Sequence, residues 1–300
     1  MPGVKPNLPL SLTMLSWGFN FVALKMVYEQ MTPPAVALVR YLGMFALLVA
    51  FSASRKESLR YPQGETFRLL TLGFLSMGVY MVFFLEGMKE SAPAEGAIIL
   101  STSPIFTALI ASAVGQEKLN RGAFAGALLA FAGVAVVVLG ASSGDHGKLL
   151  GNVLILISAV LWAASTVVSR PLVERISPFR VLTLSMPGAL IVLVPYGLLA
   201  SLHTPWTALT PTTWSMLAYV AVIAGAVGFV GFYEGVRQIG GPAAMVYQYF
   251  VPVLAALFAW LVLGRTVNGI QFVGMGIVLT GVGISNKARL AARFEGAGER

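Results

Sequence analysis

The chain alternates between apolar runs of roughly 20 residues and short segments rich in proline, glycine and charge. A helix needs about 20 consecutive apolar residues to cross the hydrocarbon layer of a bilayer. The apolar runs lie at 8–28, 34–53, 66–88, 91–113, 120–140, 149–169, 179–201, 212–236, 241–263 and 267–286. They lack the period-two alternation of membrane β-strands. The pattern therefore predicts an all-α integral membrane protein with ten transmembrane helices.

Composition narrows the chemistry that such a chain can carry. Of its 300 residues, 57% are hydrophobic and 11% are charged, whereas soluble domains contain about 25% charged residues. Cysteine is absent, and Asp145, His146 and His203 lie in predicted loops, so no thiol and no intramembrane aspartyl pair is available. Neither a phosphate-binding loop nor an H-E-x-x-H motif occurs. We therefore expect a protein that is not an enzyme and that binds no metal and no cofactor.

Basic residues are concentrated in alternate connecting segments. With the N-terminus in the cytoplasm, 15 lysines and arginines fall on the inner side and 3 on the outer side. Because cytoplasmic loops carry the excess of basic residues, we expect a multi-pass protein of the cell inner membrane with both termini in the cytoplasm. The net charge of +8 then reflects basic loops beside an anionic lipid bilayer, and we expect no nucleic-acid partner.

Three charged residues, Lys25, Arg40 and Glu95, fall within or near the predicted outer ends of helices. Long charged side chains can keep their apolar stems in the hydrocarbon while the charged group reaches the interface. We interpret these residues in that way, and a salt-bridge gate on the outer side stays open as the alternative.

The second half of the chain repeats the first. Shifted by 148 residues, segment 83–135 overlies 231–283 without a gap, and 13 of the 53 positions are identical. The less common residue types match at offsets of 148 or 145: Phe84 with Phe232, Glu86 with Glu234, Pro104 with Pro252, Asn120 with Asn268, Phe124 with Phe272, and Trp17 with Trp162.

An odd number of spans in each copy decides the expected architecture. A five-helix unit must enter the membrane from the opposite side the second time, so the two copies are inverted, as in many secondary transporters. We expect one repeat at 1–140, an inverted repeat at 149–286 and a short basic cytoplasmic tail at 287–300. Glycines of helices five and ten, such as Gly126 and Gly281, are expected to pack helices within each half. Monomer and homodimer both stay open.

Three stretches resemble the drug/metabolite transporter superfamily, in particular its EamA-like branch. They are "SWGFNFVALK" at 16–25, the segment 99–134, and its copy at 247–282. The resemblance implies a central cavity surrounded by helices 1, 3, 4, 6, 8 and 9, and transport of small organic solutes without ATP. Members usually carry an acidic residue after the glycine that ends helices four and nine. The first copy has Glu117 there, but the second has Arg265.

Candidate substrate-binding residues are the aromatic and polar side chains on these helices. They are Trp17, Asn20, Tyr80, Ser101, Trp162, Thr166, Tyr247 and Gln248. Amide groups in a membrane are costly unless they face the protein interior, and aromatic walls with a few polar groups suit a small amphipathic solute. Packing between helices is the alternative for the tryptophans.

Two further residue pairs occupy matched positions in the repeat. Pro104 and Pro252 interrupt helices four and nine, where each removes a backbone hydrogen bond. They predict hinges or carbonyls exposed to a cavity, with a packed kink as the alternative. Glu86 and Glu234 are gating or coupling candidates, although ion pairs with the basic residues three positions later are the favoured interpretation.

These observations predict a secondary transporter that works by alternating access. Its expected activity is export of amino acids or related small metabolites across the inner membrane, so its partners are a small organic solute and the lipid bilayer. Export of amphipathic drugs or cations, or a membrane sensor without transport activity, stays open. Drug carriage would call for an acidic residue in the cavity, and the sequence offers glutamates only near helix ends.

Overall fold

The computed structural model describes residues 7–116, 121–141, 146–239, 244–245, 247–264 and 269–298. Within these residues every regular element is a helix, and seven helical spans are long and apolar enough to cross a membrane. The seven spans are Leu8–Val27, Pro33–Ser54, Thr66–Glu90, Pro93–Ala113, Leu149–Val173, Pro178–Leu202 and Pro211–Ile239. Shorter apolar helices lie at Phe124–Gly133, Phe250–Leu263 and Phe272–Gly281. The prediction of an all-helical membrane protein is confirmed.

Several of these spans are divided into shorter helical elements. The first half contains α1 (Leu8–Val27), α2 (Pro33–Ser54), α3 (Thr66–Gly73), η1 (Phe74–Val79), α4 (Tyr80–Glu90), α5 (Pro93–Leu100), α6 (Ser103–Ala113) and α7 (Arg121–Ala141). The second half contains α8 (His146–Val173), α9 (Pro178–Ser185), η2 (Met186–Ala189), α10 (Leu190–Leu202), η3 (Trp206–Ala208), α11 (Pro211–Ala218), η4 (Tyr219–Val227), α12 (Gly228–Ile239), α14 (Phe250–Leu263) and α15 (Gly269–Gly298).

Turn residues in the sequence set the helix ends. Pro178 and Pro211 each occupy the first position of a helix, where the missing N–H has no intrahelical partner to lose. The preceding Ser177 accepts a hydrogen bond from a backbone N–H of the first turn, which is the usual role of an N-cap hydroxyl. At the other end, Gly115 and Gly264 have φ of 74° and 63°. This left-handed conformation ends helices and favours glycine.

Two helices contain π-helical segments at similar positions in the two halves. These are η1, between α3 and α4, and η4, between α11 and α12. A π-helical segment shifts the backbone hydrogen bonds by one residue and often lies at functional sites. In η4 the shift leaves the Ala224 carbonyl available as an acceptor. The indole Nε1 of Trp17 donates to this carbonyl at 3.0 Å.

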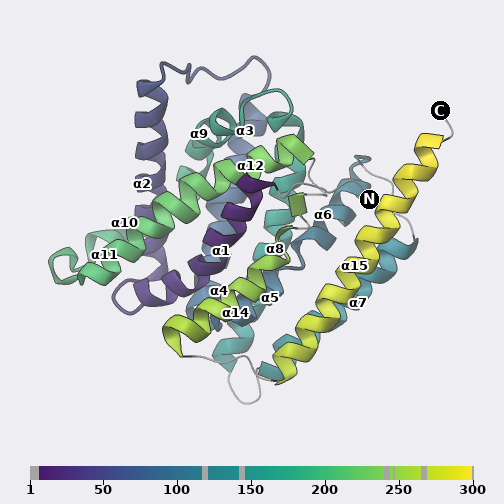
Figure 1. Cartoon of the computed structure of the whole chain (residues 1–300). Coiled ribbons are helices and arrows are strands. Elements are labelled where there is room, and N and C mark those ends of the chain that lie inside the picture. The colour runs from purple at the N-terminus through teal and green to yellow at the C-terminus, as the bar shows by residue number, and fades with distance from the viewer. Residues whose placement is uncertain are drawn as a thin grey trace.

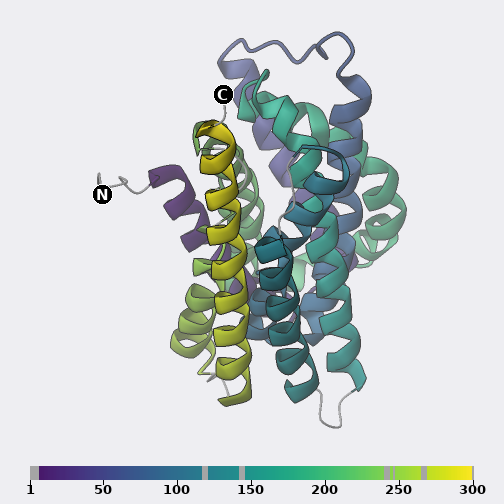
Figure 2. The same cartoon turned by 90° about the vertical axis from the view of Figure 1, so that its right-hand side faces the viewer.

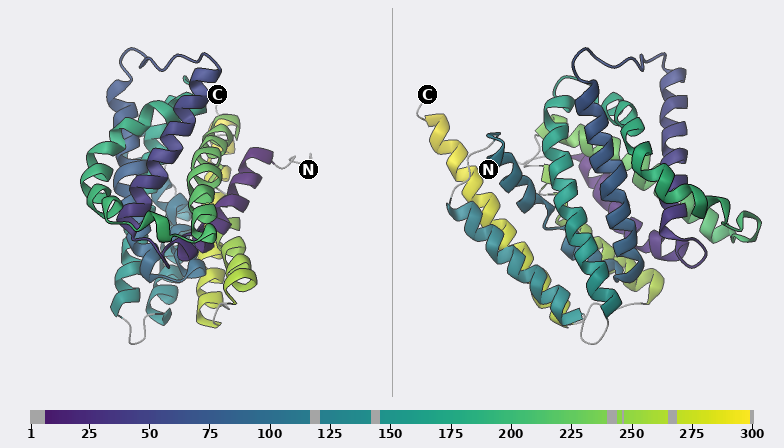
Figure 3. Two further views of the ribbon diagram at one scale, coloured as in Figure 1. Left: turned by 90° about the vertical axis from the view of Figure 1, so that its left-hand side faces the viewer. Right: turned by 180° about the vertical axis from the view of Figure 1, so that it is seen from behind.

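The helices α7 and α15 lie side by side along one edge of the molecule (Figures 1 and 2). In the right-hand view of Figure 3, from behind, the same pair runs at a slant along one edge of the molecule. Their contact is reciprocal. A Cβ at Gly133 would lie 2.6 Å from the Val278 nitrogen, and a Cβ at Gly281 would lie 2.4 Å from the Ala130 nitrogen. Only glycine permits such approach of two backbones.

Two expectations need correction, one about the glycine contacts and one about the C-terminal tail. The glycines were predicted to pack helices within each half, but Gly133 and Gly281 join one half to the other. Helix α15 also continues to Gly298, so residues 287–298 of the expected tail are helical. Alanine, arginine and glutamate in this segment are strong helix formers.

Candidate functional site

A small cavity of about 40 Å³ lies where helices of the two halves cross. Six of the eight predicted substrate-binding residues line it: Trp17, Asn20, Tyr80, Ser101, Trp162 and Gln248. The remaining lining residues are mostly apolar, among them Phe21, Phe84 and Phe229. A cavity of this volume has room for a few water molecules. Its polar lining residues Asn20, Ser101 and Gln248 are buried, so the cavity lies inside the protein.

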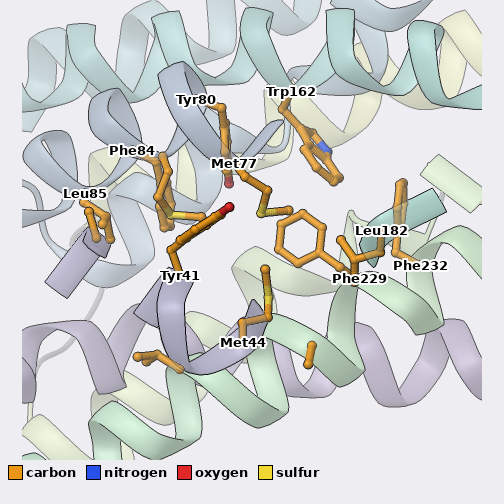
Figure 4. Close-up of a cluster of buried hydrophobic side chains, with 14 of the residues drawn as sticks. Tyr41, Met44, Met77, Tyr80, Phe84, Leu85, Trp162, Leu182, Phe229 and Phe232 are labelled. Atoms are coloured by element: carbon orange, nitrogen blue, oxygen red, sulfur yellow. The ribbon is translucent and has the colours of Figure 1, made fainter. Parts of the chain in front are cut away.

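Aromatic rings form one wall of this cavity. The two repeat-related tryptophans meet directly, with the ring centroids of Trp17 and Trp162 5.7 Å apart in an edge-to-face arrangement. Phe229 completes the contact at 5.6 Å from Trp17 and 5.5 Å from Trp162. Figure 4 shows Tyr80, Trp162 and Phe229 pointing toward one another from three different helices. Edge-to-face packing of this kind stabilises a cluster beyond its buried area.

Two amide groups in the cavity wall have an atom without a hydrogen-bond partner. These atoms are Asn20 Oδ1 and Gln248 Nε2, which are inaccessible to solvent and belong to residues that line the cavity. The two side chains are only 5% and 6% exposed. An unpaired buried polar group costs about 1–3 kcal/mol. Groups that carry such a cost beside a cavity are candidates for binding a solute.

Arg40 also lines the cavity, and the sequence did not predict it there. It lies seven residues after Pro33, about 10 Å along the axis of α2, and it is 5% exposed. Its Nη1 donates to the Met81 sulfur at 3.8 Å. The interpretation of Arg40 as reaching the outer surface is wrong, because the side chain is buried. The family resemblance had also placed no residue of the second helix at the cavity.

An arginine in this position is energetically costly. Placing arginine at the centre of a transmembrane helix costs about 2.5–3.5 kcal/mol on insertion scales. Such residues usually face a protein interior or cavity and mark a pathway for substrates or ions. Arg40 forms no ion pair with any of the described residues.

Two of the predicted binding residues do not line the cavity. Thr166 is buried, but its hydroxyl donates to the Trp162 carbonyl one turn earlier in the same helix, at 2.9 Å. Such bonding to the own helix is common for threonine. The Tyr247 hydroxyl instead accepts a hydrogen bond from the Asn7 backbone N–H at 3.0 Å. Tyr247 therefore holds the start of α1 rather than facing the cavity.

Helices four and nine are both interrupted beside the cavity. Residues Ser101 and Thr102 separate α5 from α6, with Pro104 in the first turn of α6. The residues before α14 form a matching turn at Gln248. The interruptions thus occur in the two matched helices, as the prolines predicted.

The carbonyls freed by the two prolines are satisfied within the protein. The Leu100 carbonyl accepts from the Ser103 hydroxyl at 2.6 Å, and the Gln248 carbonyl accepts from the Val251 N–H at 3.0 Å. Each carbonyl thus has one partner within the protein, and Leu100 lines the cavity, so the expectation of hinges or of carbonyls exposed to a cavity stays a prediction. Local hydroxyl and amide donors replaced the lost bonds, as polar groups in a membrane require.

The matched glutamates have different partners. Glu234 forms the expected ion pair with Arg237, at 2.6 Å. Glu86 accepts a hydrogen bond from the Tyr196 hydroxyl, while Lys89 pairs with its neighbour Glu90 at 3.9 Å. The favoured interpretation is thus confirmed for Glu234 and wrong for Glu86, because α10 brings a hydroxyl to that carboxylate.

A third carboxylate, Glu95, is buried and belongs to a polar network. It is 1% exposed and accepts from Asn152 Nδ2 at 3.1 Å. The Asn152 Oδ1 accepts in turn from the Ser91 hydroxyl at 2.6 Å. Glu95 therefore stabilises the start of α5 against α8 instead of reaching the surface. Glu117 and Arg265 lie outside the described residues.

A second and larger hollow lies on the side of the bundle. It is an apolar groove of about 860 Å³ bordered by α1, α2, η4 and α12, with Phe19, Phe51 and Phe258 among its walls. Its polar lining is limited to a few side chains such as Thr13, Ser16 and Glu234. Thr13 and Ser16 donate to carbonyls of their own helix. A surface of this composition suits lipid chains, and the cavity that is lined by Asn20, Gln248 and Arg40 is the better candidate site.

Comparison with known families gives a match over both halves of the chain. The model described as the EamA-like transporter family matches residues 6–139 and again residues 149–287. Together the two matches cover most of the 300 residues.

Individual relatives are similar over nearly their whole length. A probable amino-acid metabolite efflux pump of Salmonella typhimurium is 29% identical over 95% of this chain and 97% of its own. An uncharacterized transporter of Archaeoglobus fulgidus is 27% identical over 93% and 96%. One solved crystal structure superposes with a TM-score of 0.68 at 20% identity, covering 95% of this chain and 98% of that one. At that identity the likeness shows a shared fold.

Proposed function

Because the chain belongs to the EamA-like transporter family, a family of multi-pass membrane transporters, we propose that it exports amino acids or related small metabolites. The observation that carries this proposal is the closed cavity at the crossing of the two halves. Its lining is largely aromatic, and two of its lining residues, Asn20 and Gln248, each have an amide atom without a partner. Such a combination suits a small solute with one apolar and one polar end.

The proposed architecture is ten transmembrane helices in two inverted five-helix repeats, 1–140 and 149–286. Three observations support it. The family model matches twice, once in each half. The contacts of Gly133 and Gly281 are related by the 148-residue offset. The start of α1, the end of α15 and the connection from α2 to α3 lie in the upper half of Figures 1 and 2, consistent with both termini on one side.

We propose that the cavity opens to one side of the membrane and then to the other, as alternating access requires. A volume of about 40 Å³ cannot hold an amino acid, so helices must separate before a solute enters. The interruptions near Pro104 and Pro252 and the π-helical segments η1 and η4 border the crossing in both halves. We propose that these weak points act as hinges. Repeat-related hinges would allow the same cavity to open to either side of the membrane.

The proposed source of energy rests on one motif that the sequence lacks and on two glutamates. No phosphate-binding loop occurs in the sequence, which favours secondary transport. Glu86 and Glu234 stay candidates for gating or coupling, although their contacts with Tyr196 and Arg237 give each a structural role as well. The proposed location is the cell inner membrane, with both termini in the cytoplasm.

Amino-acid derivatives are the favoured substrate class. The Salmonella relative is named a probable amino-acid metabolite efflux pump. Export of cationic drugs is the second candidate, but the charged residue that lines the cavity is Arg40. A cation would meet a like charge there.

Flux into proteoliposomes tests the proposal. The purified protein is reconstituted and the uptake of labelled L-phenylalanine and other amino acids is measured. We expect saturable uptake, reduced at least about tenfold by Trp17→Ala and by Trp162→Ala, because each opens the aromatic wall. Trp260→Ala is the matched control, since Trp260 is 57% exposed on α14. Uptake no faster than in empty liposomes, from folded protein, would remove the exporter assignment.

A further inference from the structure

We propose that Arg40 determines the substrate specificity of this cavity by binding the carboxylate of the solute. In this arrangement Gln248 Nε2 donates beside the guanidinium, and Asn20 Oδ1 accepts from a substrate ammonium group. The solute class is thus a carboxylate with an apolar, preferably aromatic, side chain. The inference rests on the proposed function, because it requires that the cavity receive a solute.

The first argument is the burial of the guanidinium. Arg40 is 5% exposed and lies within α2, well inside a span that is long and apolar enough to cross the membrane. Its cavity neighbours Phe84, Met81 and Phe229 are apolar. A charge in such surroundings is costly unless it is paired, and an intramembrane arginine usually marks a pathway for a substrate or an ion.

The second argument is that the described protein groups leave its donors largely unused. A guanidinium has five N–H donors, and the recorded contact of Arg40 is with the Met81 sulfur, a weak acceptor, at 3.8 Å. The phenols that interact electrostatically with Arg40 are Tyr80, Tyr28 and Tyr219. The hydroxyls of Tyr28 and Tyr219 donate to backbone carbonyls at 3.0 and 2.8 Å. They offer neutral lone pairs and no negative charge. No carboxylate of the described residues forms an ion pair with Arg40.

The third argument is the complementarity of the remaining polar atoms. One unpartnered atom in the cavity wall is a donor, Gln248 Nε2, and one is an acceptor, Asn20 Oδ1. A carboxylate accepts from arginine in a bidentate, charge-assisted contact and has further lone pairs for an amide donor. An ammonium group supplies the donors that a carbonyl oxygen lacks. The cavity therefore offers a partner for each end of a zwitterion.

The aromatic wall completes the preference. Trp17, Trp162 and Phe229 pack edge to face around the cavity. An apolar solute side chain can replace part of this packing when the helices separate. A solute with a positive charge and no carboxylate gains the same apolar contact, but it faces the Arg40 charge without compensation.

Three probes separate the contributions of the two charged ends. L-phenylalanine carries a carboxylate and an ammonium group, 3-phenylpropionate carries only the carboxylate, and L-phenylalaninamide carries only the ammonium group. Binding to the purified protein is followed by the fluorescence of the cavity tryptophans, and flux is followed in proteoliposomes. Both measurements are made on wild type, Arg40→Met and Arg40→Lys.

We expect wild type to bind both carboxylates and to bind the amide at least about tenfold more weakly, because the amide lacks a charge-assisted partner for Arg40. Arg40→Met should weaken carboxylate binding about tenfold or more without weakening that of the amide. Arg40→Lys should recover part of the loss. A merely structural role would change the binding of all three probes equally.

The outcomes distinguish this inference from the proposed function. One outcome is that carboxylates bind in an Arg40-dependent way but no flux is measured. This result would support the binding site and contradict the transport function. Flux of L-phenylalanine with equal half-saturation in wild type and Arg40→Met would retain the transporter and overturn the role of Arg40. Absence of binding of either carboxylate to folded wild type would also overturn it. The melting temperature controls for folding, and Arg40→Lys is the second variant if Arg40→Met unfolds.

Discussion

At the scale of single residues, the cavity combines side chains that are costly for folding. Asn20 and Gln248 each have an unpartnered atom there, and Arg40 has a buried charge. The side-chain oxygen of Gln30 has partners: Oε1 accepts from the Thr210 N–H at 2.9 Å and from the Thr213 hydroxyl at 2.6 Å. Buried polar groups are normally satisfied. Asn20 and Gln248 are two exceptions that line a cavity, where a ligand would complete them.

Because Gln248 has an unpartnered amide atom and Gln30 has a paired one, replacing each by methionine should change the free energy of unfolding in opposite directions. Gln248→Met removes an unpartnered amide at nearly constant volume, so it should raise the free energy of unfolding by about 1 kcal/mol and weaken the binding of L-phenylalanine about fivefold. Gln30→Met removes a used acceptor at a partly exposed position and should lower the free energy of unfolding by about 0.5–1.5 kcal/mol. Thermal unfolding in detergent and fluorescence titration measure both effects. A lower free energy of unfolding in Gln248→Met would contradict the conclusion that the Gln248 amide has no partner in the folded protein.

At the scale of elements, the helices that cross near the cavity are not continuous. The span from Pro93 to Ala113 is divided at Ser101 and Thr102, and the span that ends at Leu263 has a turn at Gln248. Segments η1 and η4 interrupt the α-helical hydrogen bonding of the spans Thr66–Glu90 and Pro211–Ile239. Interrupted helices deform more easily than continuous ones because fewer backbone hydrogen bonds must break. The elements most able to bend therefore border the candidate site.

The prolines provide the test at this scale. Replacing Pro104 or Pro252 by alanine allows an additional backbone hydrogen bond and favours a continuous helix. We expect initial transport rates to fall at least about fivefold, with less change in the yield of folded protein. Pro211→Ala is the control, because Pro211 begins α11 at the start of a span, so its replacement does not join two helical segments of one span. Unchanged rates in both cavity variants would contradict the hinge role.

At the scale of the whole molecule, the two halves meet along several repeat-related contacts. Trp17 touches Trp162 at the cavity, and Gly133 and Gly281 bring α7 against α15 at the edge of the bundle. Contacts between equivalent positions are expected near a pseudo-two-fold axis. An axis in the membrane plane would place the equivalent loops of the two halves on opposite sides of the membrane.

The absence of cysteine from the sequence makes this topology directly testable. Ser58 and His203 are both exposed, in the connection after α2 and in its counterpart after α10. In intact cells, a membrane-impermeant maleimide should label His203→Cys and should label Ser58→Cys only after permeabilisation. Labelling of both variants from the same side would contradict the inverted arrangement. Retained transport activity serves as the control for folding.

Much of the fold was determined by local information in the sequence. The length of the apolar runs set the spans, since a helix satisfies its own backbone in lipid, and prolines and glycines placed their ends. The matched tryptophans and prolines were visible as a repeat. Six of eight candidate cavity residues followed from their helices and chemistry.

Only the tertiary structure decided which side chains share a cavity. Arg40 reaches it from α2, Tyr247 binds the start of α1, and Tyr196 reaches Glu86 from a span far along the chain. In a span that is apolar on all sides, hydrophobic periodicity does not distinguish the face toward lipid from the face toward protein. Hydrogen bonding, burial and the approach of glycines select that face, and they depend on neighbours distant in sequence.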